Sequence, residues 1–404
     1  MVVGSKFEPA YRWIPGQTNR YQFTNVWTTI AGSATEPGND DGTNTDARFN
    51  QPFGLAMDPA GNLFVADTLN HTIRRMSPVE SQWITTTVAG TPGLSGAADG
   101  TNNTARFNQP TGIAADALGN LFVSDSLNNT IRKIRIIGTR AIVTTIAGLP
   151  GIKGFRDGTN HVAAFNRPMG IAVDHHGIIY VADSLNHTIR EIRPRGSNWV
   201  VKTIAGSPLS PGKADGMWLG ARFNQPAGIT LDPAGNLYVA DQLNSTIRKM
   251  HLSGTNWIVS TIAGFPGMRG WNDGLFPSSR FSTPSAISAD TQTNLYVTDS
   301  SNNNIRKMTP IGTNWLVSTL AGWSGSRGTN SGLATDTQFS YPSAIAVNTD
   351  GSLYYVADSL NDTIRAGGRT VNMTNILLGT WQQMPVVKSG KGFLIRSGTS
   401  PFAH

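Results

Sequence analysis

The sequence predicts an all-β fold, a six-bladed β-propeller of four-stranded antiparallel blades. Two sequence markers recur with one step of 58 residues, a phenylalanine that opens each unit and a glycine that ends the motif T-[IVL]-A-G. The phenylalanines are Phe49, Phe107, Phe165, Phe223, Phe281 and Phe339, and the glycines are Gly32, Gly90, Gly148, Gly206, Gly264 and Gly322. Two markers that keep one period over six copies indicate a repeat architecture, and short β-rich pieces between turns indicate a propeller.

One copy of the unit, residues 223–250, shows three of the strands expected in each blade. Its sequence, FNQPAGITLDPAGNLYVADQLNSTIRKM, holds a short apolar piece, an alternating β-rich piece and a β-branched piece. Turn residues at 233–236 and 242–245 separate these pieces. A fourth strand is expected to begin near Trp257, a position that Trp83, Trp199 and Trp315 hold in other copies. Such a blade exposes two apolar faces, which a closed ring buries against its neighbours.

The two ends of the repeat array are expected to close the ring. Residues 26–30 match the fourth strand of the later copies, whereas the sixth copy supplies only three strands. We therefore expect the N-terminal strand to complete the last blade and to remove the free strand edges. Residues 373–379 are a weaker alternative for this closing strand. The sixth copy also carries one additional residue at 353–356, which predicts a β-bulge.

The repeat also sets the domain organisation. Length alone would divide 404 residues into two or three domains, but the six copies must form one closed array over residues 26–365. Residues 1–25 are then an N-terminal extension, and residues 366–404 a basic C-terminal extension. The first residues lack a basic segment followed by an apolar core, so no signal peptide is visible. No apolar run approaches the length of a transmembrane segment.

The charges lie mostly outside the repeats. The formal net charge is +7, and the two extensions hold seven basic residues against one acidic residue, so the repeat body is close to neutral, at about +1. A nucleic-acid-binding face normally shows as a basic excess in the folded body, and its lack argues against RNA as the partner. The chain has no cysteine, which excludes disulfides, thiolate metal sites and a cysteine nucleophile.

An aspartate and an arginine recur in every copy. The aspartates are Asp67, Asp125, Asp183, Asp241, Asp299 and Asp358, and the arginines are Arg74, Arg132, Arg190, Arg248, Arg306 and Arg365. A group that is present in every blade is expected to serve every blade, because a catalytic site breaks the symmetry of a repeat. We therefore expect the carboxylates to fix the turn after the second strand and to accept hydrogen bonds from the arginines.

The histidines and acidic turns do not predict a metal site, a cofactor site or a catalytic residue. His71 and His187 share a turn position that Asn129, Ser245, Asn303 and Asp362 fill in the other copies, which indicates a tolerant polar site. The neighbours His175 and His176 fall in one tight turn, where both side chains rarely reach the same metal ion. The turn at 40–42 lacks further oxygen ligands at calcium-loop spacing. No phosphate-binding glycine loop or G-x-S-x-G motif is present.

The repeat unit resembles the NHL-repeat family, especially bacterial surface proteins and teneurin-type propellers. The resemblance is carried by FNQPTGIAAD at 107–116, GNLFVSD at 119–125 and NNTIRK at 128–133, with a preceding T-I-A-G and Asp-Gly, and it covers residues 26–365. It implies the propeller fold. It also implies several classes of function, namely adhesion or sensing outside the cell, binding of protein or RNA, and metal-dependent lyase activity. The histidines on several blades that the lyases need are missing as a periodic set.

The most informative departures from the repeat lie in the 16-residue segments between each glycine and the next phenylalanine. In the first two copies these segments are small and polar, whereas the later four gain aromatic and basic residues. Because all six segments join one blade to the next, they are expected on one face of the disc. The candidate ligand-binding residues are Lys153, Phe155, Arg156, Trp218, Arg269, Trp271, Trp323 and Arg327. Exposed aromatic residues with arginine are typical of a binding surface, and the alternative is that they fold back over the blades as lids.

These features predict a non-enzymatic binding module, a monomer that recognises a protein or a glycan through the aromatic face. We expect it outside the cell or at the cell surface. The second hypothesis is a lyase or hydrolase with its site at the central channel, which needs unrepeated polar residues on the axis. The third is RNA binding. The fold by itself does not separate these functions.

Overall fold

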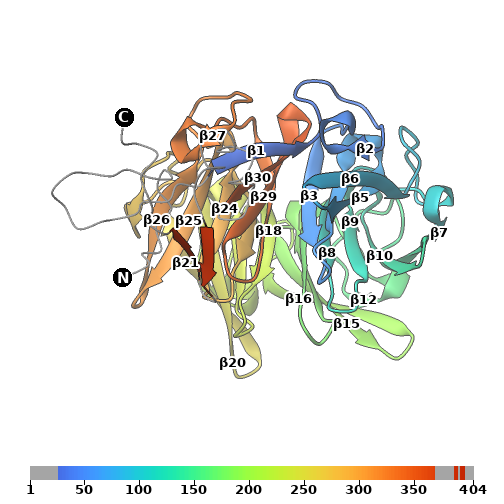
Figure 1. The fold of residues 1–404 in the computed structure, drawn as a ribbon. Helices are drawn as coiled ribbons and strands as arrows, with labels where there is room; N and C mark the ends of the chain where they lie inside the picture. Colours follow the sequence, from blue (N-terminus) through green and yellow to red (C-terminus); the bar gives the residue numbers. More distant parts are fainter. Residues whose placement is uncertain (1–25, 369–385, 390–391, 396–404) are drawn as a thin grey trace, which may run out of the picture.

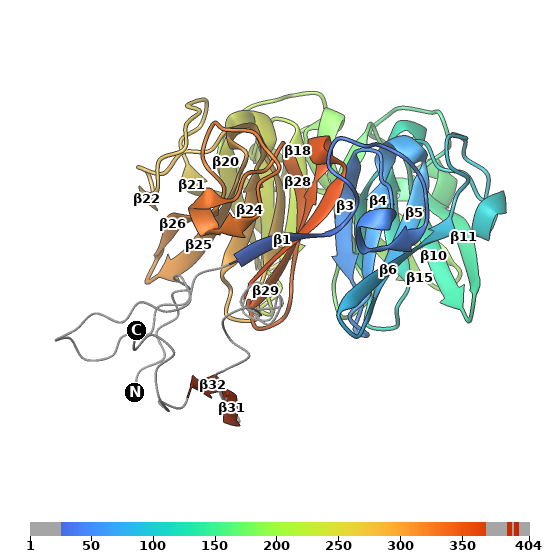
Figure 2. The same ribbon diagram turned by 45° about the horizontal axis from the view of Figure 1, so that its top comes forward.

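Six antiparallel sheets stand around one central axis in the computed structural model (Figures 1 and 2). The structure describes residues 26–368 and the backbone of 386–389 and 392–395. The predicted extension 1–25, most of the extension 366–404 and the alternative closing strand at 373–379 lie outside the described residues. Strands β31 (Val386–Ser389) and β32 (Gly392–Ile395) form a separate two-stranded sheet. The all-β six-bladed propeller is therefore confirmed.

Each blade runs outward from the axis in the same order. The innermost strands are β3 (Pro52–Met57), β8 (Pro110–Ala115), β13 (Pro168–Val173), β18 (Pro226–Leu231), β23 (Pro284–Ala289) and β28 (Pro342–Val347). The second strands are β4 (Leu63–Asp67), β9 (Leu121–Asp125), β14 (Ile179–Asp183), β19 (Leu237–Asp241), β24 (Leu295–Asp299) and β29 (Leu353–Asp358). The third strands are β5 (Thr72–Val79), β10 (Thr130–Ile137), β15 (Thr188–Arg195), β20 (Thr246–Ser253), β25 (Asn304–Ile311) and β30 (Thr363–Gly368). The fourth strands are β6 (Gln82–Ala89), β11 (Arg140–Ala147), β16 (Asn198–Gly206), β21 (Asn256–Gly264), β26 (Asn314–Ala321) and β1 (Val26–Ala31).

The prediction of four strands per blade was wrong by one strand. A fifth, two-residue strand lies at the outer edge of each blade: β2 (Gly42–Thr43), β7 (Gly100–Thr101), β12 (Gly158–Thr159), β17 (Gly216–Met217), β22 (Gly274–Leu275) and β27 (Gly332–Leu333). These residues belong to the 16-residue segments, which turn back at Asp-Gly and pair with the fourth strand, as Gly42 does with Thr85. Two residues are too few to show a strand periodicity in the sequence.

Short 3-10 turns complete the units. Those that follow the fifth strand are η1 (Asn44–Asp46), η3 (Asn102–Thr104), η5 (Asn160–Val162), η7 (Trp218–Gly220) and η10 (Ala334–Asp336). Those between the second and third strands are η2 (Thr68–Asn70), η4 (Ser126–Asn128), η6 (Ser184–Asn186), η8 (Gln242–Asn244), η9 (Ser300–Asn302) and η11 (Ser359–Asn361). Within the described residues there is no α-helix.

The core lies between the blades. Each hydrophobic cluster takes side chains from two neighbouring blades, as where Phe64 and Ile73 of one blade meet Phe107 and Leu121 of the next. The tryptophans near the start of the fourth strands contact an aromatic residue of the preceding blade, and Trp315 and Tyr238 have ring centroids 5.6 Å apart. Burial of such faces is the main favourable term that holds the ring together.

The N-terminal strand β1 pairs with β30 and closes the last blade (Figure 1). The contact differs from its counterparts in one way. In the fifth blade Met308 lies opposite Val317, whereas in the closing blade Gly367 lies opposite Trp27. Trp27 is fully buried, and a Cβ atom on Gly367 would lie 2.4 Å from its indole ring. The closing strand thus carries a large side chain that fills the space left by a glycine.

The additional residue of the sixth copy does not form a bulge, so that prediction was wrong. Strands β29 and β30 pair without a register shift. The β28–β29 turn is longer instead: the N–H of Asn348 donates to the carbonyl of Leu353, five residues on, whereas Asp58 donates to Asn62, four residues on. A surface turn accepts an insertion at lower cost than a paired strand does.

The recurring aspartates and arginines have the structural role that was predicted. Arg74 is fully buried, and its guanidinium donates to Asp67 (2.8 Å) and Asp41 (2.8 Å). Asp67 also accepts from the backbone N–H of Asn50 and from the side chain of Asn70. Burial raises the pKa of Asp67 to about 6, against the opposing effect of Arg74. The other copies repeat this arrangement, except that Ser331 replaces the outer aspartate in the last one.

The turn position that His71 and His187 hold joins neighbouring blades. His71 and His187 adopt a left-handed backbone conformation, and their Nδ1 atoms accept the N–H of Gln109 and Gln225, each at 3.1 Å. In other blades the Oδ1 atom of Asn129 accepts the corresponding N–H of the next blade. A neutral imidazole is required for this contact, because a protonated one has no acceptor.

The first prediction concerns the closing contact. Trp27→Val should lower the free energy of unfolding by about 3 kcal/mol, because it leaves a cavity beside Gly367. Gly367→Met should also destabilise, because the new side chain meets the Trp27 ring. The double variant Trp27→Val, Gly367→Met recreates the pair found in the fifth blade and should recover most of the loss. A urea-unfolding double-mutant cycle measures this coupling, and additive losses would contradict the proposed fit.

The second prediction concerns acid sensitivity. Burial lowers the pKa of His71 and His187 below its ordinary value. Each neutral histidine therefore contributes stability above about pH 6.5, the unfolded pKa, and this contribution is lost as the pH falls through the folded pKa. The variant His71→Asn, His187→Asn introduces the residue that Asn129 supplies in the second blade. It should lose less stability than the parent between pH 7.5 and pH 5, by about 1 kcal/mol per hydrogen bond retained. Urea midpoints at both pH values measure the difference, and equal losses would refute it.

Candidate functional site

The six 16-residue segments emerge on one face of the disc, which we call the loop face (Figure 2). Each segment is held to the scaffold at two points. In the fifth segment the N–H of Gly267 donates to the carbonyl of Asn244 (3.1 Å), and the N–H of Gly270 donates to that of Phe281 (3.1 Å). The side chains around and between these anchors project from a fixed backbone. The loop face is thus built on backbone hydrogen bonds that recur in other blades.

The structure leaves the predicted aromatic residues exposed. Trp323 is 66% exposed, Trp271 60%, Phe155 48% and Trp218 43%. The basic residues Lys153, Arg156, Arg269 and Arg327 are exposed as well. None of these aromatic residues is a buried lid, although their role as ligand-binding residues stays a prediction.

The fifth segment carries several exposed apolar side chains. Trp271 shares the segment with Met268 and Phe265, which are 52% and 41% exposed, and these last two residues form an isolated β-bridge. The guanidinium of Arg280 lies 5.2 Å from the Phe265 ring. Sequence reasoning missed Phe265, although its position directly after a T-[IVL]-A-G glycine, where Trp323 also lies, was a usable signal.

Trp218 stands apart from this group. It lies in η7 beside the outer edge strand, where its Nε1 donates to the carbonyl of Thr203 (3.3 Å) and the Lys202 ammonium is 5.9 Å from its ring. Trp218 is therefore partly tied to the preceding blade, because Thr203 lies in β16.

The basic residues differ in whether their side chains bond to other residues. The Nε of Arg156 donates to the carbonyl of Val162 at 2.7 Å, which holds its side chain against the segment. In contrast, the described residues offer no ion-pair partner to Lys153, Arg269 or Arg327. These three cations are available to a negatively charged or strongly polar ligand.

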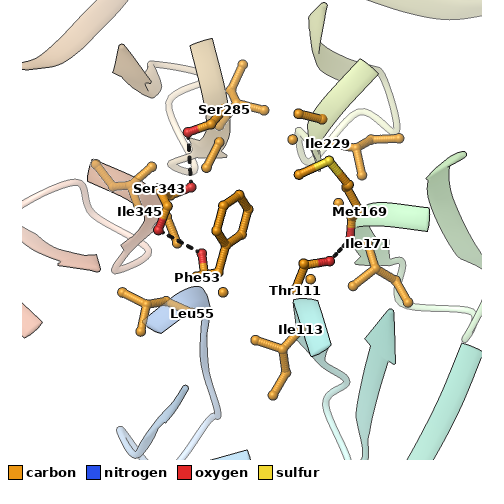
Figure 3. Close-up of a pocket in the computed structure, with 18 residues that line it drawn as sticks. Phe53, Leu55, Thr111, Ile113, Met169, Ile171, Ile229, Ser285, Ser343 and Ile345 are labelled. Carbon is orange, nitrogen blue, oxygen red and sulfur yellow. Dashed lines mark hydrogen bonds between the residues drawn. The ribbon is translucent and has the colours of Figure 1, made fainter. Parts of the chain in front are cut away.

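The central channel is narrow and mostly apolar. Three residues from each innermost strand line it, and its cavity is about 70 Å³ (Figure 3). The strands approach closely, since a Cβ atom on Gly54 would lie 1.9 Å from the carbonyl oxygen of Thr111. The hydroxyls of Ser285 and Ser343 face backbone carbonyls of the next blade, at 3.2 Å and 3.1 Å (Figure 3). No carboxylate, imidazole or amine is among the lining residues that the structure describes.

The mouth of this channel on the loop face carries departures that sequence reasoning missed. Two residues after each repeat phenylalanine stand Gln51, Gln109, Arg167, Gln225, Thr283 and Tyr341, all in the left-handed backbone region. Three are glutamine, so Arg167, Thr283 and Tyr341 break the repeat. Burial raises the pKa of Tyr341, and the positive charge of Arg167 opposes that shift. The signal in the sequence was the change from FNQP to FNRP and FSYP.

A second cavity, of about 380 Å³, lies beside the hairpin turns between the first and second strands. Its lining includes Asp174, Asp232 and Asp290. Each carboxylate serves its own turn: Asp232 accepts from Asn236 (2.7 Å) and from the Tyr238 hydroxyl (2.9 Å). Nowhere in the described chain do three or more histidine, cysteine, aspartate or glutamate residues form a group that could hold a metal ion.

Comparison with known proteins identifies the repeat. The family model described as NHL repeat matches residues 49–76, 107–134 and 223–250. The chain is 30% identical over 332 residues to Protein SUPPRESSOR OF QUENCHING 1, chloroplastic, of Arabidopsis thaliana, a match that covers 78% of this chain and 30% of that protein. It is 28% identical to human NHL repeat-containing protein 2, over 74% of this chain and 44% of that protein. The chain thus spans less than half the length of these relatives.

Teneurins and bacterial propellers are also similar. Human Teneurin-1 is 28% identical over 52% of this chain, which is 8% of its own length. An auxiliary nutrient binding protein from Bacteroides ovatus superimposes with a TM-score of 0.64 at 17% identity, covering 86% of this chain and 77% of that one. At this identity the match concerns the fold alone. No helix in the described part of the chain is long and apolar enough to cross a membrane.

Proposed function

The chain is an NHL-repeat β-propeller, and from this premise we propose that it is a non-enzymatic binding module that recognises a protein or a glycan through its loop face. The proposal treats the propeller as a monomer outside the cell or at the cell surface. The candidate contact residues are Lys153, Phe155, Arg156, Trp218, Arg269, Trp271, Trp323 and Arg327.

The observation that carries the proposal is the uneven distribution of exposed apolar side chains around the ring. At the position after the T-[IVL]-A-G glycine, the sixth segment has Trp323 where the first has Ser33. Seven residues after that glycine, the fifth segment has Trp271 where the second has Ala97. The scaffold does not need these aromatic residues, because other blades fold without them. Large exposed apolar side chains that the fold does not use are typical of interaction sites.

The chemistry of this face suits both classes of ligand. Trp271 and Trp323 can stack against sugar rings or peptide side chains, and the free cations Arg269 and Arg327 can donate hydrogen bonds to hydroxyls, carbonyls or carboxylates. The similar fold of a protein named auxiliary nutrient binding protein is consistent with a binding role. The channel lining offers no general acid or base, so binding is favoured over catalysis on the axis.

The third prediction tests the loop face. The purified protein is screened against glycan, peptide and RNA arrays beside the variant Trp271→Ala, Trp323→Ser, in which both new residues occur at the same positions of other segments. We expect the affinity for the ligand to fall at least tenfold, because aromatic anchors carry a large share of binding energy. Circular dichroism and the unfolding midpoint should stay unchanged.

A matched control changes Trp218, which lies beside the outer edge strand. Trp218→Asn places the residue of η1, η3 and η5 at the start of η7 and should weaken binding less, because Trp218 is tied to Thr203. Ligand binding that is equally strong in the parent and in the Trp271→Ala, Trp323→Ser variant would refute a site on this face. Binding to RNA alone would replace the proposed ligand class.

A further inference from the structure

Three residues at the channel mouth depart from the glutamine of the other blades, and two of them, Arg167 and Tyr341, lie on opposite blades. Arg167 belongs to the third blade and Tyr341 to the sixth, and the innermost strands contact one another in ring order from β3 to β28 and back to β3. Blades three and six are therefore opposite across the axis. Each of the two residues directly precedes the proline that begins an innermost strand, two residues before the channel lining. The positive charge of Arg167 opposes the rise in the pKa of the Tyr341 phenol that burial causes.

Neither side chain makes a polar contact that the fold uses among the described residues. The backbone N–H groups of Arg167 and Tyr341 donate to Asn129 and Asn303, which secures the blade-to-blade contact. Their side chains, however, take part in no hydrogen bond or ion pair with described residues. Glutamine makes the same backbone contact in blades two and four. The guanidinium and the phenol are therefore not required for folding at these positions.

The surface between them is apolar and also lacks six-fold symmetry. The first residues of the lining below the mouth include Phe53 and Met169, where other blades have Thr111, Ala227, Ser285 and Ser343. Figure 3 shows the Phe53 ring and the Met169 thioether entering the channel from β3 and β13, two strands that β8 separates in the ring. The cavity below holds about 70 Å³, well under the roughly 150 Å³ of an apolar cavity that accepts benzene. A bound molecule would therefore lie over the mouth, with only a short apolar group directed inward.

We propose that the channel mouth binds a small organic carboxylate, with Arg167 and Tyr341 holding the carboxylate and with Phe53 and Met169 contacting its apolar group. This site goes beyond the proposed loop-face function. It lies on the axis and uses none of the loop-face residues, so either proposal can fail without the other.

The chemistry favours a carboxylate over other anions. A planar guanidinium pairs with both oxygens of a carboxylate, and a phenol adds one further donor. One cation balances one negative charge, whereas a phosphate dianion would need a second cation, and no other charged residue holds an equivalent position at the mouth. The apolar floor adds affinity for an attached aliphatic group and little for an inorganic ion.

The experiment measures binding of butanoate and hexanoate by calorimetry and by saturation-transfer NMR. Butanamide is the neutral counterpart, and inorganic phosphate is the alternative anion. The test variants are Arg167→Gln, which introduces the residue of blades one, two and four, and Tyr341→Phe, which removes only the hydroxyl. Arg140→Gln removes the same charge from an exposed position at the start of β11, outside both proposed sites, and is the matched control. Phe53→Thr, which introduces the residue that Thr111 supplies in the second blade, tests the apolar floor.

We expect saturable carboxylate binding that falls at least tenfold in Arg167→Gln and several-fold in Tyr341→Phe, while Arg140→Gln binds like the parent. Butanamide should bind weakly to the parent and equally weakly to Arg167→Gln. Phe53→Thr should weaken hexanoate more than butanoate. The proposal is overturned if neither carboxylate binds, if Arg167→Gln and Arg140→Gln have equal effects, or if phosphate binds more tightly than the carboxylates.

Discussion

The buried pairing of one arginine with two aspartates is the interaction on which five of the six blades depend. Arg74 has no exposed surface, and removing a partner from such a buried pair generally costs about 3–5 kcal/mol. Its guanidinium joins the second strand at Asp67 to the loop segment at Asp41, and Asp41 in turn accepts from the backbone N–H and hydroxyl of Thr87 in the fourth strand. One side chain therefore fixes the strand, the turn and the loop together. The loop face is ordered because its segments are bound to this network.

The closing blade shows what happens where the network is weaker. Ser331 stands where the other copies have an aspartate, and its hydroxyl accepts from Arg365 at 3.2 Å. The fourth strand of that blade comes from the other end of the repeat array, so no short turn joins it to the third strand. At this joint the pair of Trp27 and Gly367 replaces the buried pair of Val317 and Met308 in the fifth blade. One large indole therefore fills the space that two medium-sized side chains share elsewhere.

The sequence was sufficient for the parts of the molecule that repeat. The period, the closing strand and the structural role of Asp67 and Arg74 could be predicted because each is a local pattern seen several times. The fifth strand escaped prediction because Gly42 and Thr43 pair with Thr85 and Ile84, a contact between segments that are distant along the chain. The bulge was wrongly predicted because an insertion near 353 can enter the turn or the strand, and the sequence does not distinguish the two. The exposure of Trp271 and the attachment of Trp218 to Thr203 depend on side-chain contacts that no periodicity encodes.

Arg167 also escaped prediction from the sequence, and its side chain is the group that we assign to ligand binding at the channel mouth. The predicted contact residues all come from the 16-residue segments, whereas Arg167 lies two residues after a repeat phenylalanine, outside those segments. At this position the backbone N–H donates to the preceding blade in five of the six blades, whereas the side chains of Arg167 and Tyr341 have no polar partner among the described residues. A repeat protein can change such side chains with little effect on folding, as the glutamine, threonine and tyrosine variants of this position show. At some positions the backbone has a structural role while the side chain departs from the repeat. A change of side chain there costs the least stability, so function can evolve at these positions. In this propeller they gather at the channel mouth and in the loop segments.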